Sequence, residues 1–128
     1  MNKKQFAQIR HHLEKTQLQM AQLLGVSLKA IESFEQGWRK IPVHAERQAL
    51  LLLALKESSF KKNRACWSVK KCSKATRQNC PASEFNAGQM CWLINGTICQ
   101  GKVQKNWHKK MDLCNKCEVF HLYFPSMQ

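Results

Sequence analysis

Apolar residues recur every three or four positions in several segments of the first 57 residues, a spacing that places them on one face of a helix. In the first segment the apolar stripe consists of Phe6, Ile9 and Leu13. In the last, leucine and alanine fill every position from Ala49 to Leu55, which predicts burial on more than one side. The pattern predicts helices over residues 4–15, 17–24, 28–36 and 43–56.

A tight turn, Gly25-Val26-Ser27, joins the second and third predicted helices. Gly25 suits the left-handed position after one helix, and Ser27 suits the N-cap of the next. Gly37 ends the third helix, and Pro42 discourages its continuation. Two short helices joined in this way form a helix-turn-helix, whose second helix reads the major groove of DNA.

Nine residues in and around this turn form a wider pattern: Gln17, Ala21, Leu24, Gly25, Val26, Ser27, Ile31, Glu35 and Gly37. Over roughly residues 4–56 the chain resembles the phage-repressor and Cro type of helix-turn-helix, also called the xenobiotic-response-element (XRE) family. The resemblance implies a five-helix, lambda-repressor-like DNA-binding domain. It also implies an ion pair between Arg10 on the first helix and Glu35 at the end of the recognition helix.

The third helix and its flanks are therefore expected to contact double-stranded DNA. By resemblance, Gln17 at a helix N-terminus would contact a phosphate. Among the outward positions of the third helix, Lys29 could donate to guanine, and Leu28 could contact a thymine methyl group. Ser33 could donate or accept, whereas Glu32 either accepts from a cytosine amine or points away from the phosphates.

The residues after this helix extend the expected contact surface. Arg39 and Lys40 are placed to reach phosphates, while Trp38 is expected to pack on the edge of the core. The alternative is that the whole face is merely solvated. The expected DNA-binding residues are Gln17, Ser27, Leu28, Lys29, Glu32, Ser33, Arg39 and Lys40.

The charge of the chain favours a polyanionic partner, either nucleic acid or an acidic membrane surface. The 128 residues include 21 Lys and Arg against 8 Asp and Glu, a formal net charge of +13. Residues 1–60 hold 9 basic and 5 acidic side chains, and residues 61–128 hold 12 and 3, so the second half is the more basic. The acidic residues are few and scattered, and no nucleophile–base arrangement is visible, so we do not expect an enzyme.

No secretory signal is visible, because no apolar run follows the basic residues at the start of the chain. The longest apolar run, residues 49–55, is far too short to span a bilayer. A soluble cytoplasmic protein without membrane contact is therefore expected. In that compartment the seven cysteines are better suited to metal binding or redox chemistry than to structural disulfides.

The spacing of the cysteines is irregular, and only Cys114 and Cys117 have the short separation of a metal knuckle. Between Cys91 and Cys99, two β-prone runs flank Asn95-Gly96, which predicts a β-hairpin with a type I′ turn. In such a hairpin Cys91 and Cys99 would lie on opposite faces. We therefore expect the seven cysteines to divide between roles rather than converge on one centre.

Several short motifs accompany these cysteines: Cys66-Trp67, Lys70-Lys71-Cys72, Cys80-Pro81-Ala82, Asn86-Ala87-Gly88, Cys91-Trp92, Gly96-Thr97, Cys99, Gly101-Lys102-Val103-Gln104 and Cys114-x-x-Cys117. Together they resemble the cysteine-rich "two-CW" module appended to signalling proteins of anaerobic and metal-reducing bacteria. The resemblance implies a context of sensing or regulation.

The candidate metal ligands are Cys66, Cys72, Cys80, Cys91, Cys99, Cys114 and Cys117. An iron–sulfur cluster, a zinc ion, and thiol pairs that act without metal all remain open for this region. Such a small module, with few large apolar side chains, commonly needs a staple of this kind. Nearby lysines would offset the negative charge of thiolates.

The sequence thus predicts a mainly α protein in three parts: a helix-turn-helix domain over residues 1–57, a basic linker over 58–65, and a small α+β cysteine-rich module with a β-hairpin over 66–124. The expected function is a homodimeric, sequence-specific transcription regulator that senses redox state or metal. Two alternatives stand beside it. One is a constitutive repressor with a structural zinc module, and the other is a protein-interaction adaptor or antitoxin.

Overall fold

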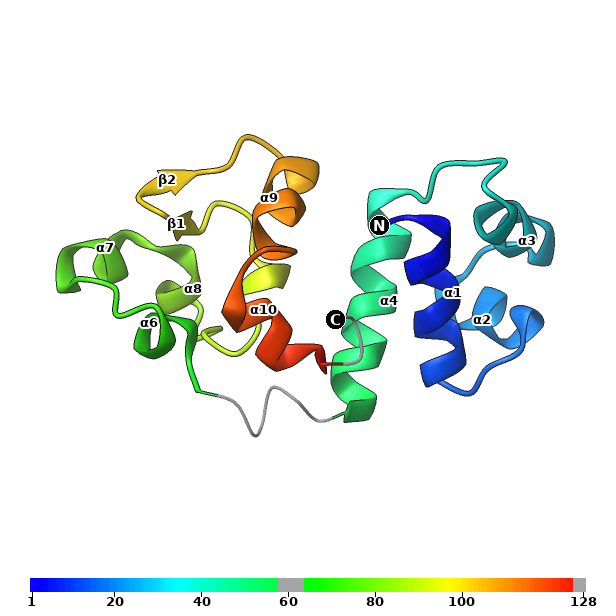
Figure 1. Cartoon of the computed structure of the whole chain (residues 1–128), viewed down its shortest axis with the longest axis horizontal. Coiled ribbons are helices and arrows are strands. Elements are labelled where there is room, and N and C mark those ends of the chain that lie inside the picture. Colours follow the sequence, from blue (N-terminus) through cyan, green and yellow to red (C-terminus); the bar gives the residue numbers. More distant parts are fainter. Residues whose placement is uncertain (58–63, 126–128) are drawn as a thin grey trace. The chain divides into compact units, whose positions relative to one another are not determined.

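The computed structural model describes residues 1–57 and 64–125, which fall into two compact units that divide after Glu57 (Figure 1). The protein is mainly helical, with one small two-stranded antiparallel sheet among the residues described. Most of the linker predicted over residues 58–65 lies outside the described residues. Within the described ranges, no helix combines the length and apolar character needed to cross a membrane.

Over residues 1–57 the structure describes four helices, whereas the sequence predicted five in the DNA-binding domain. These are α1 (Lys3–His12), α2 (Gln17–Leu24), α3 (Leu28–Gln36) and α4 (Val43–Glu57). Each of the first three begins at a side-chain N-cap, from Asn2, Thr16 and Ser27 respectively. These caps satisfy backbone N–H groups that have no partner inside the helix.

The turn between α2 and α3 has the predicted chemistry. Gly25 adopts a left-handed conformation (φ 67°), and the Val26 amide donates to the carbonyl of Ala21 at 3.0 Å. Ser27 then accepts from the Ala30 amide at 3.1 Å to begin α3. The backbone pattern of Gly25 is that of a left-handed helix C-cap, which residues with a Cβ adopt only at a cost.

Each of the four helices of the first unit contributes buried side chains to one hydrophobic core. Phe6 of α1 and Phe34 of α3 meet edge to face, with ring centroids 5.7 Å apart. Met20, Ile31 and Leu50 are fully or almost fully buried beside them. Because α1 to α4 share this core, the exposed face of α3 is set by the packing of its opposite face.

The second unit is built from short elements. In chain order these are α6 (Cys66–Val69), α7 (Lys74–Asn79), α8 (Pro81–Glu84), η1 (Cys91–Leu93), β1 (Ile98–Cys99), β2 (Lys102–Val103), α9 (Trp107–Cys114) and α10 (Glu118–Tyr123). Trp92 and Phe124 form its aromatic core with ring centroids 5.2 Å apart, and Phe120 packs 4.9 Å from Phe124.

The β-hairpin exists but does not lie where the sequence predicts it. Cys91–Leu93 form a 3₁₀ helix rather than a strand, and the paired residues are Ile98 with Val103 and Cys99 with Lys102. The hairpin turn is Gln100-Gly101, both with positive φ (54° and 76°), as a type I′ turn requires. Burial of Trp92 in the aromatic core draws its neighbours out of an extended conformation.

Candidate functional site

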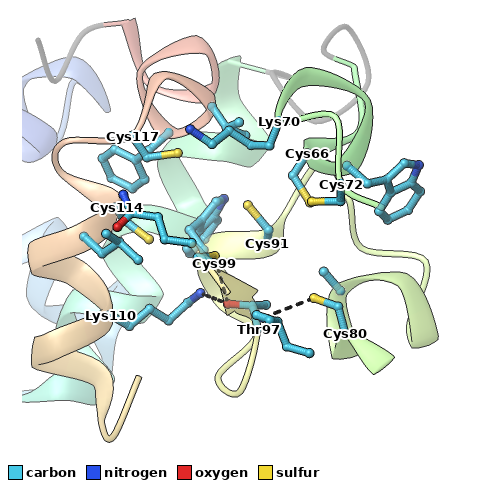
Figure 2. A pocket seen from close by; sticks show the side chains of 18 of the residues that line it. Cys66, Lys70, Cys72, Cys80, Cys91, Thr97, Cys99, Lys110, Cys114 and Cys117 are labelled. Carbon is cyan, nitrogen blue, oxygen red and sulfur yellow. Dashed lines mark hydrogen bonds between the residues drawn. The ribbon is translucent and has the colours of Figure 1, made fainter. Parts of the chain in front are cut away.

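All seven cysteines of the chain line a single cavity of about 100 Å³ in the second unit (Figure 2). Every one of them is a free thiol. Figure 2 shows Cys91 between two groups of thiols, with Cys114 and Cys117 on one side and Cys66 and Cys80 on the other. The argument that Cys91 and Cys99 lie on opposite faces of a hairpin is wrong, because Cys91–Leu93 form a 3₁₀ helix. That the cysteines divide between roles rather than converge on one centre stays a prediction, since within the described residues no three potential ligands are close enough to hold one ion.

Chain reversals and helix ends aim these sulfurs inward. Cys80 precedes Pro81 at the start of α8, and its sulfur accepts from the Ile98 amide of β1 at 3.4 Å. Cys114 ends α9, and Cys117 precedes α10, with the Cys117 amide donating to the Cys114 carbonyl at 2.9 Å. This turn therefore brings the two thiols of the knuckle to the same cavity wall.

Gly88 positions the backbone at Cys66, at one end of the cavity. Its carbonyl accepts from the Cys66 amide at 2.8 Å and from the hydroxyl of Tyr123. A Cβ atom at Gly88 would lie 2.6 Å from the Cβ of Ala65 and 2.8 Å from the ring of Trp67. Glycine is therefore required here by close approach, and it ties α6 to α10.

Two Cys-Trp pairs contribute aromatic walls. Trp92 is buried, whereas Trp67 is half-buried and carries the guanidinium of Arg77 4.6 Å above its ring. Both rings line the cavity, as do the apolar side chains of Val119 and Phe120. The cavity is thus mostly apolar apart from its thiols, a few cations and a few neutral polar side chains, although Cys72 is exposed to solvent.

Lys110 is the main charged group inside this site. Only 3% of it is exposed, and its Nζ donates to Thr97 Oγ1 at 2.7 Å. Thr97 is as deeply buried and also accepts from the Cys99 thiol at 3.6 Å. No Asp or Glu side chain of residues 1–57 or 64–125 lies within ion-pair distance of Lys110.

The thiols differ in acidity. A hydrogen bond from Cys91, aided by a backbone hydrogen bond from Trp67 and by the charge of Lys110, lowers the pKa of Cys66 to about 7. The same hydrogen bond and burial raise the pKa of Cys91, while burial raises the pKa of Cys114 to about 11 and also raises that of Cys72. Burial likewise raises the pKa of Tyr123. Of Cys66, Cys72, Cys91 and Cys114, Cys66 is therefore the most readily converted to thiolate near neutral pH.

The donor set suits a soft metal. The cavity offers seven sulfurs and a buried cation, and its lining includes no carboxylate or imidazole. In the part of the chain described, no three Cys, His, Asp or Glu side chains are close enough to hold one ion. A single zinc ion with bonds of about 2.3 Å would need four sulfurs roughly 3.8 Å apart. Metal binding would therefore draw thiols inward, or would use an occupant that fills more of the cavity.

The candidate DNA-binding residues lie on the first unit, and most of them are accessible. Lys29, Glu32, Arg39 and Lys40 are exposed, Leu28 is partly exposed at the start of α3, and Gln17 is half-buried at the start of α2. Ser27 caps α3. Ser33 is the exception, because it is 8% exposed and faces the core rather than outward.

Trp38 also differs from expectation. It was expected on the edge of the core, but it is 77% exposed. Its backbone is nonetheless fixed, because the Trp38 amide donates to the Ser33 carbonyl at 2.9 Å as part of the cap that ends α3 at Gly37. Lys3 of α1 lies against Gly37, so this loop has a third cation near Arg39 and Lys40.

Sequence reasoning missed the roles of Thr97 and Gly88, and it named Lys110 only as one of several lysines expected to offset thiolate charge. For Lys110 a signal was present, because it precedes Cys114 by four residues and follows Trp107 by three, which places all three on one helical face. Thr97 and Gly88 carried no such signal, because their roles depend on contacts between segments far apart in the chain.

Comparisons with protein families, curated proteins and solved structures find no match for this chain. A functional assignment must therefore come from the residues and their arrangement.

Proposed function

We propose that this protein is a DNA-binding transcription regulator whose second unit holds a thiolate-ligated metal centre and responds to redox state or metal supply. The observation that carries the proposal is the convergence of all seven cysteines on one cavity that also contains a buried lysine. A purely structural role would need four ligands at most. The DNA-binding half rests on the geometry of α2 and α3.

The first unit supports DNA binding through the division of α3 into two faces. Ala30, Ile31 and Phe34 are buried, and Leu28 and Lys29 are left accessible at its N-terminal end. In a helix-turn-helix this is the end that contacts base edges. Basic side chains at both ends of α3 would neutralise phosphates and fix the register.

The second unit has the residues to hold a metal centre. Cys114 and Cys117, with partners from Cys66, Cys72, Cys80, Cys91 and Cys99, would supply the thiolates. A bound iron–sulfur cluster or zinc ion would cross-link these segments, and iron would also add redox chemistry. Since the elements here are short, the metal-free unit should be less stable, so loss or oxidation of the centre would loosen it. That change is the proposed signal.

The test is to purify the full chain without oxygen and to measure iron, zinc, acid-labile sulfide and the visible spectrum. Operator DNA selected from a random pool is then titrated before and after exposure to air or chelator. A change in affinity of at least about tenfold is expected. Unchanged affinity would defeat the sensing role, and failure to select any sequence would defeat the DNA-binding role.

A matched control separates the two units. The double variant Lys29→Ala/Lys40→Ala should lose DNA binding and keep the metal, whereas Cys114→Ser/Cys117→Ser should lose metal and keep the fold of residues 1–57. We further propose that the protein acts as a cytoplasmic homodimer on palindromic DNA, which light scattering and footprinting of the complex would test.

One alternative has a specific observation in its favour. The second unit contains helices of four to eight residues and strands of two, and such a unit commonly needs a staple. Zinc could supply it in a constitutive repressor. That reading predicts zinc rather than iron, unfolding of the second unit by chelator, and a DNA affinity that air does not alter.

A further inference from the structure

The side chain of Lys110 departs from the usual behaviour of lysine. It extends from α9 into the cavity, and only 3% of the residue is exposed. Lysine side chains normally bury their methylene groups and keep the ammonium in water. Here the ammonium has left water, and its described hydrogen-bond partner is the neutral hydroxyl of Thr97.

An ammonium held in this way lacks a counter-charge. Glu14, Glu35, Glu46 and Glu118 each form an ion pair with a cation other than Lys110. A buried charge is tolerated when it is paired, and is otherwise costly. Something in this cavity should therefore be negative when the protein is in its working state.

The groups that can supply negative charge are the sulfurs. Lys110, Cys66, Cys91 and Cys114 line the same cavity. Burial raises the pKa of Cys114, and Lys110 acts against that rise. Thr97 bridges Lys110 to the Cys99 thiol. Figure 2 shows the Lys110 ammonium beside Thr97, on the same cavity as thiols from several elements.

We propose that Lys110 is the internal counter-cation of an anionic, polythiolate-ligated metal centre in this cavity, and that Thr97 holds it in position. The inference rests on the proposed metal centre. Four thiolates on Zn²⁺, or on a 4Fe–4S cluster of charge 2+, both leave a net charge of 2−, so the two sources share this chemistry. Lys110 is a positioning residue here, because it acts through charge rather than as a ligand.

The proposal has an unusual consequence: replacing Lys110 by a neutral residue should have opposite effects on the two states. In the metal-free protein, Lys110→Met removes a buried, unbalanced charge, so thermal stability should stay equal or rise. In the loaded protein the same change removes the counter-charge, so the metal should be released faster. A merely structural lysine would lower stability in both states.

The experiment uses the full chain loaded in separate arms with Zn²⁺ alone or with Fe²⁺ and sulfide. Release to a chelator is followed for wild type, Lys110→Met, Lys110→Arg and Lys109→Met. Lys109 is exposed and does not line the cavity, so its variant matches the loss of one charge. We expect release at least about tenfold faster in Lys110→Met, near wild-type release in Lys110→Arg, and no change in Lys109→Met. With iron, the reduction potential of Lys110→Met should also be more negative, because a cation favours the reduced centre.

The outcomes separate the two proposals. Metal retained equally well by Lys110→Met and wild type, with an unchanged potential, overturns the role of Lys110 and leaves the metal centre standing. A drop in metal-free stability together with unchanged release does the same. A wild-type protein that takes up neither iron nor zinc overturns both proposals.

Discussion

The guanidinium of Arg10 donates two hydrogen bonds to the carboxylate of Glu35, of 2.8 Å from Nε and 2.9 Å from Nη2. This pair joins α1 to the end of α3 and is the ion pair predicted from the sequence. Both side chains are mostly buried, at 14% and 9% exposure, and Arg10 also donates to the Lys15 carbonyl at 2.9 Å. The pair therefore fixes α3 relative to α1 through a geometry that lysine could not reproduce.

We expect Glu35→Gln to destabilise the first unit by about 2–3 kcal/mol, because it leaves Arg10 partly buried without its counter-charge. The double change Arg10→Met/Glu35→Leu should cost less than the sum of the single changes, since no unpaired charge remains. Chemical denaturation of wild type, Arg10→Met, Glu35→Leu and the double variant forms a double-mutant cycle, which measures the coupling free energy between the two side chains. Additive effects would show that the pair contributes little beyond its packing.

Two substitutions on α3 should separate base reading from core packing. Lys29→Ala should reduce discrimination between operator and random DNA by about 1–3 kcal/mol, because Lys29 is exposed on the face proposed to meet base edges. Ser33→Ala should leave that discrimination unchanged, because Ser33 faces the core. Competition binding against a randomised pool tests both. A loss of discrimination in Ser33→Ala would show that α3 does not meet the bases with the face proposed here.

Lys40 offers a prediction of a different kind. As a phosphate contact it should bind all sequences alike, so Lys40→Ala should weaken operator and random DNA equally. The slope of log affinity against log salt should fall by about 1. Titrations at four salt concentrations give the slope. Lys109→Met, which removes a charge from the second unit, is the control for a change in net charge alone.

The exposure of Trp38 gives a test of the loop after α3. Because the indole is 77% exposed, Trp38→Ala should alter stability by no more than about 0.5 kcal/mol. It should nevertheless weaken DNA binding, since Trp38 lies between the end of α3 and the cations Arg39 and Lys40. Thermal denaturation and DNA titration of the same preparation decide the matter. Lower stability with unchanged affinity would restore the packing role expected from the sequence.

Local chemistry explains which parts of the fold could be predicted. Gly25, Ser27 and Gly37 act within a few residues of themselves, so their helix-capping roles could be predicted from the sequence alone. Ser33 could not be placed, because helical spacing shows that a face is polar but not how far the core reaches around the helix. That reach depends on which side chains of α1 and α2 pack against α3.

In the second unit, contacts between residues far apart in the sequence override the local signals. Asn95-Gly96 does form a turn, with Gly96 at φ 86°, but a turn fixes a hairpin only when both flanks are free to pair. Here Trp92 packs against Phe124, a contact across 32 residues that no local pattern indicates. The convergence of the cysteines follows from this same packing, which is why spacing alone predicted the candidate ligands but not their common cavity.

Gly88 does not line the cavity, but Gly88→Ala should displace the cavity residue Cys66. The added Cβ would lie 2.6–2.9 Å from Ala65 and Trp67, so the start of α6 must shift and carry Cys66 with it. We expect a cost of about 1–3 kcal/mol and faster metal release. Gly101→Asn is the control, because nothing lies within 4 Å of its Cβ position and asparagine tolerates a positive φ. Equal metal retention in both variants would show that Gly88 does not position Cys66.

The acidity of Cys66 predicts how the metal-free protein responds to pH. Its pKa of about 7 lies below the ordinary value of 9.0 because Cys91 donates a hydrogen bond to it, with smaller contributions from the Trp67 backbone amide and the positive charge of Lys110. The thiolate should therefore form as the pH rises through 7, and the alkylation rate of Cys66 should level off above that point. Below pH 7 the rate should fall about tenfold for each pH unit.

Cys114 provides the internal comparison. Burial raises its pKa to about 11, so its alkylation rate should still be rising at pH 10. Peptide mass spectrometry after brief iodoacetamide pulses between pH 5 and 10 resolves the two thiols in one sample. Lys110→Met should move the Cys66 midpoint to higher pH, because the positive charge that favours the thiolate is gone. A midpoint shared by Cys66 and Cys114, or one that Lys110→Met leaves in place, would contradict the arrangement of Cys66, Cys91 and Lys110 described for this cavity.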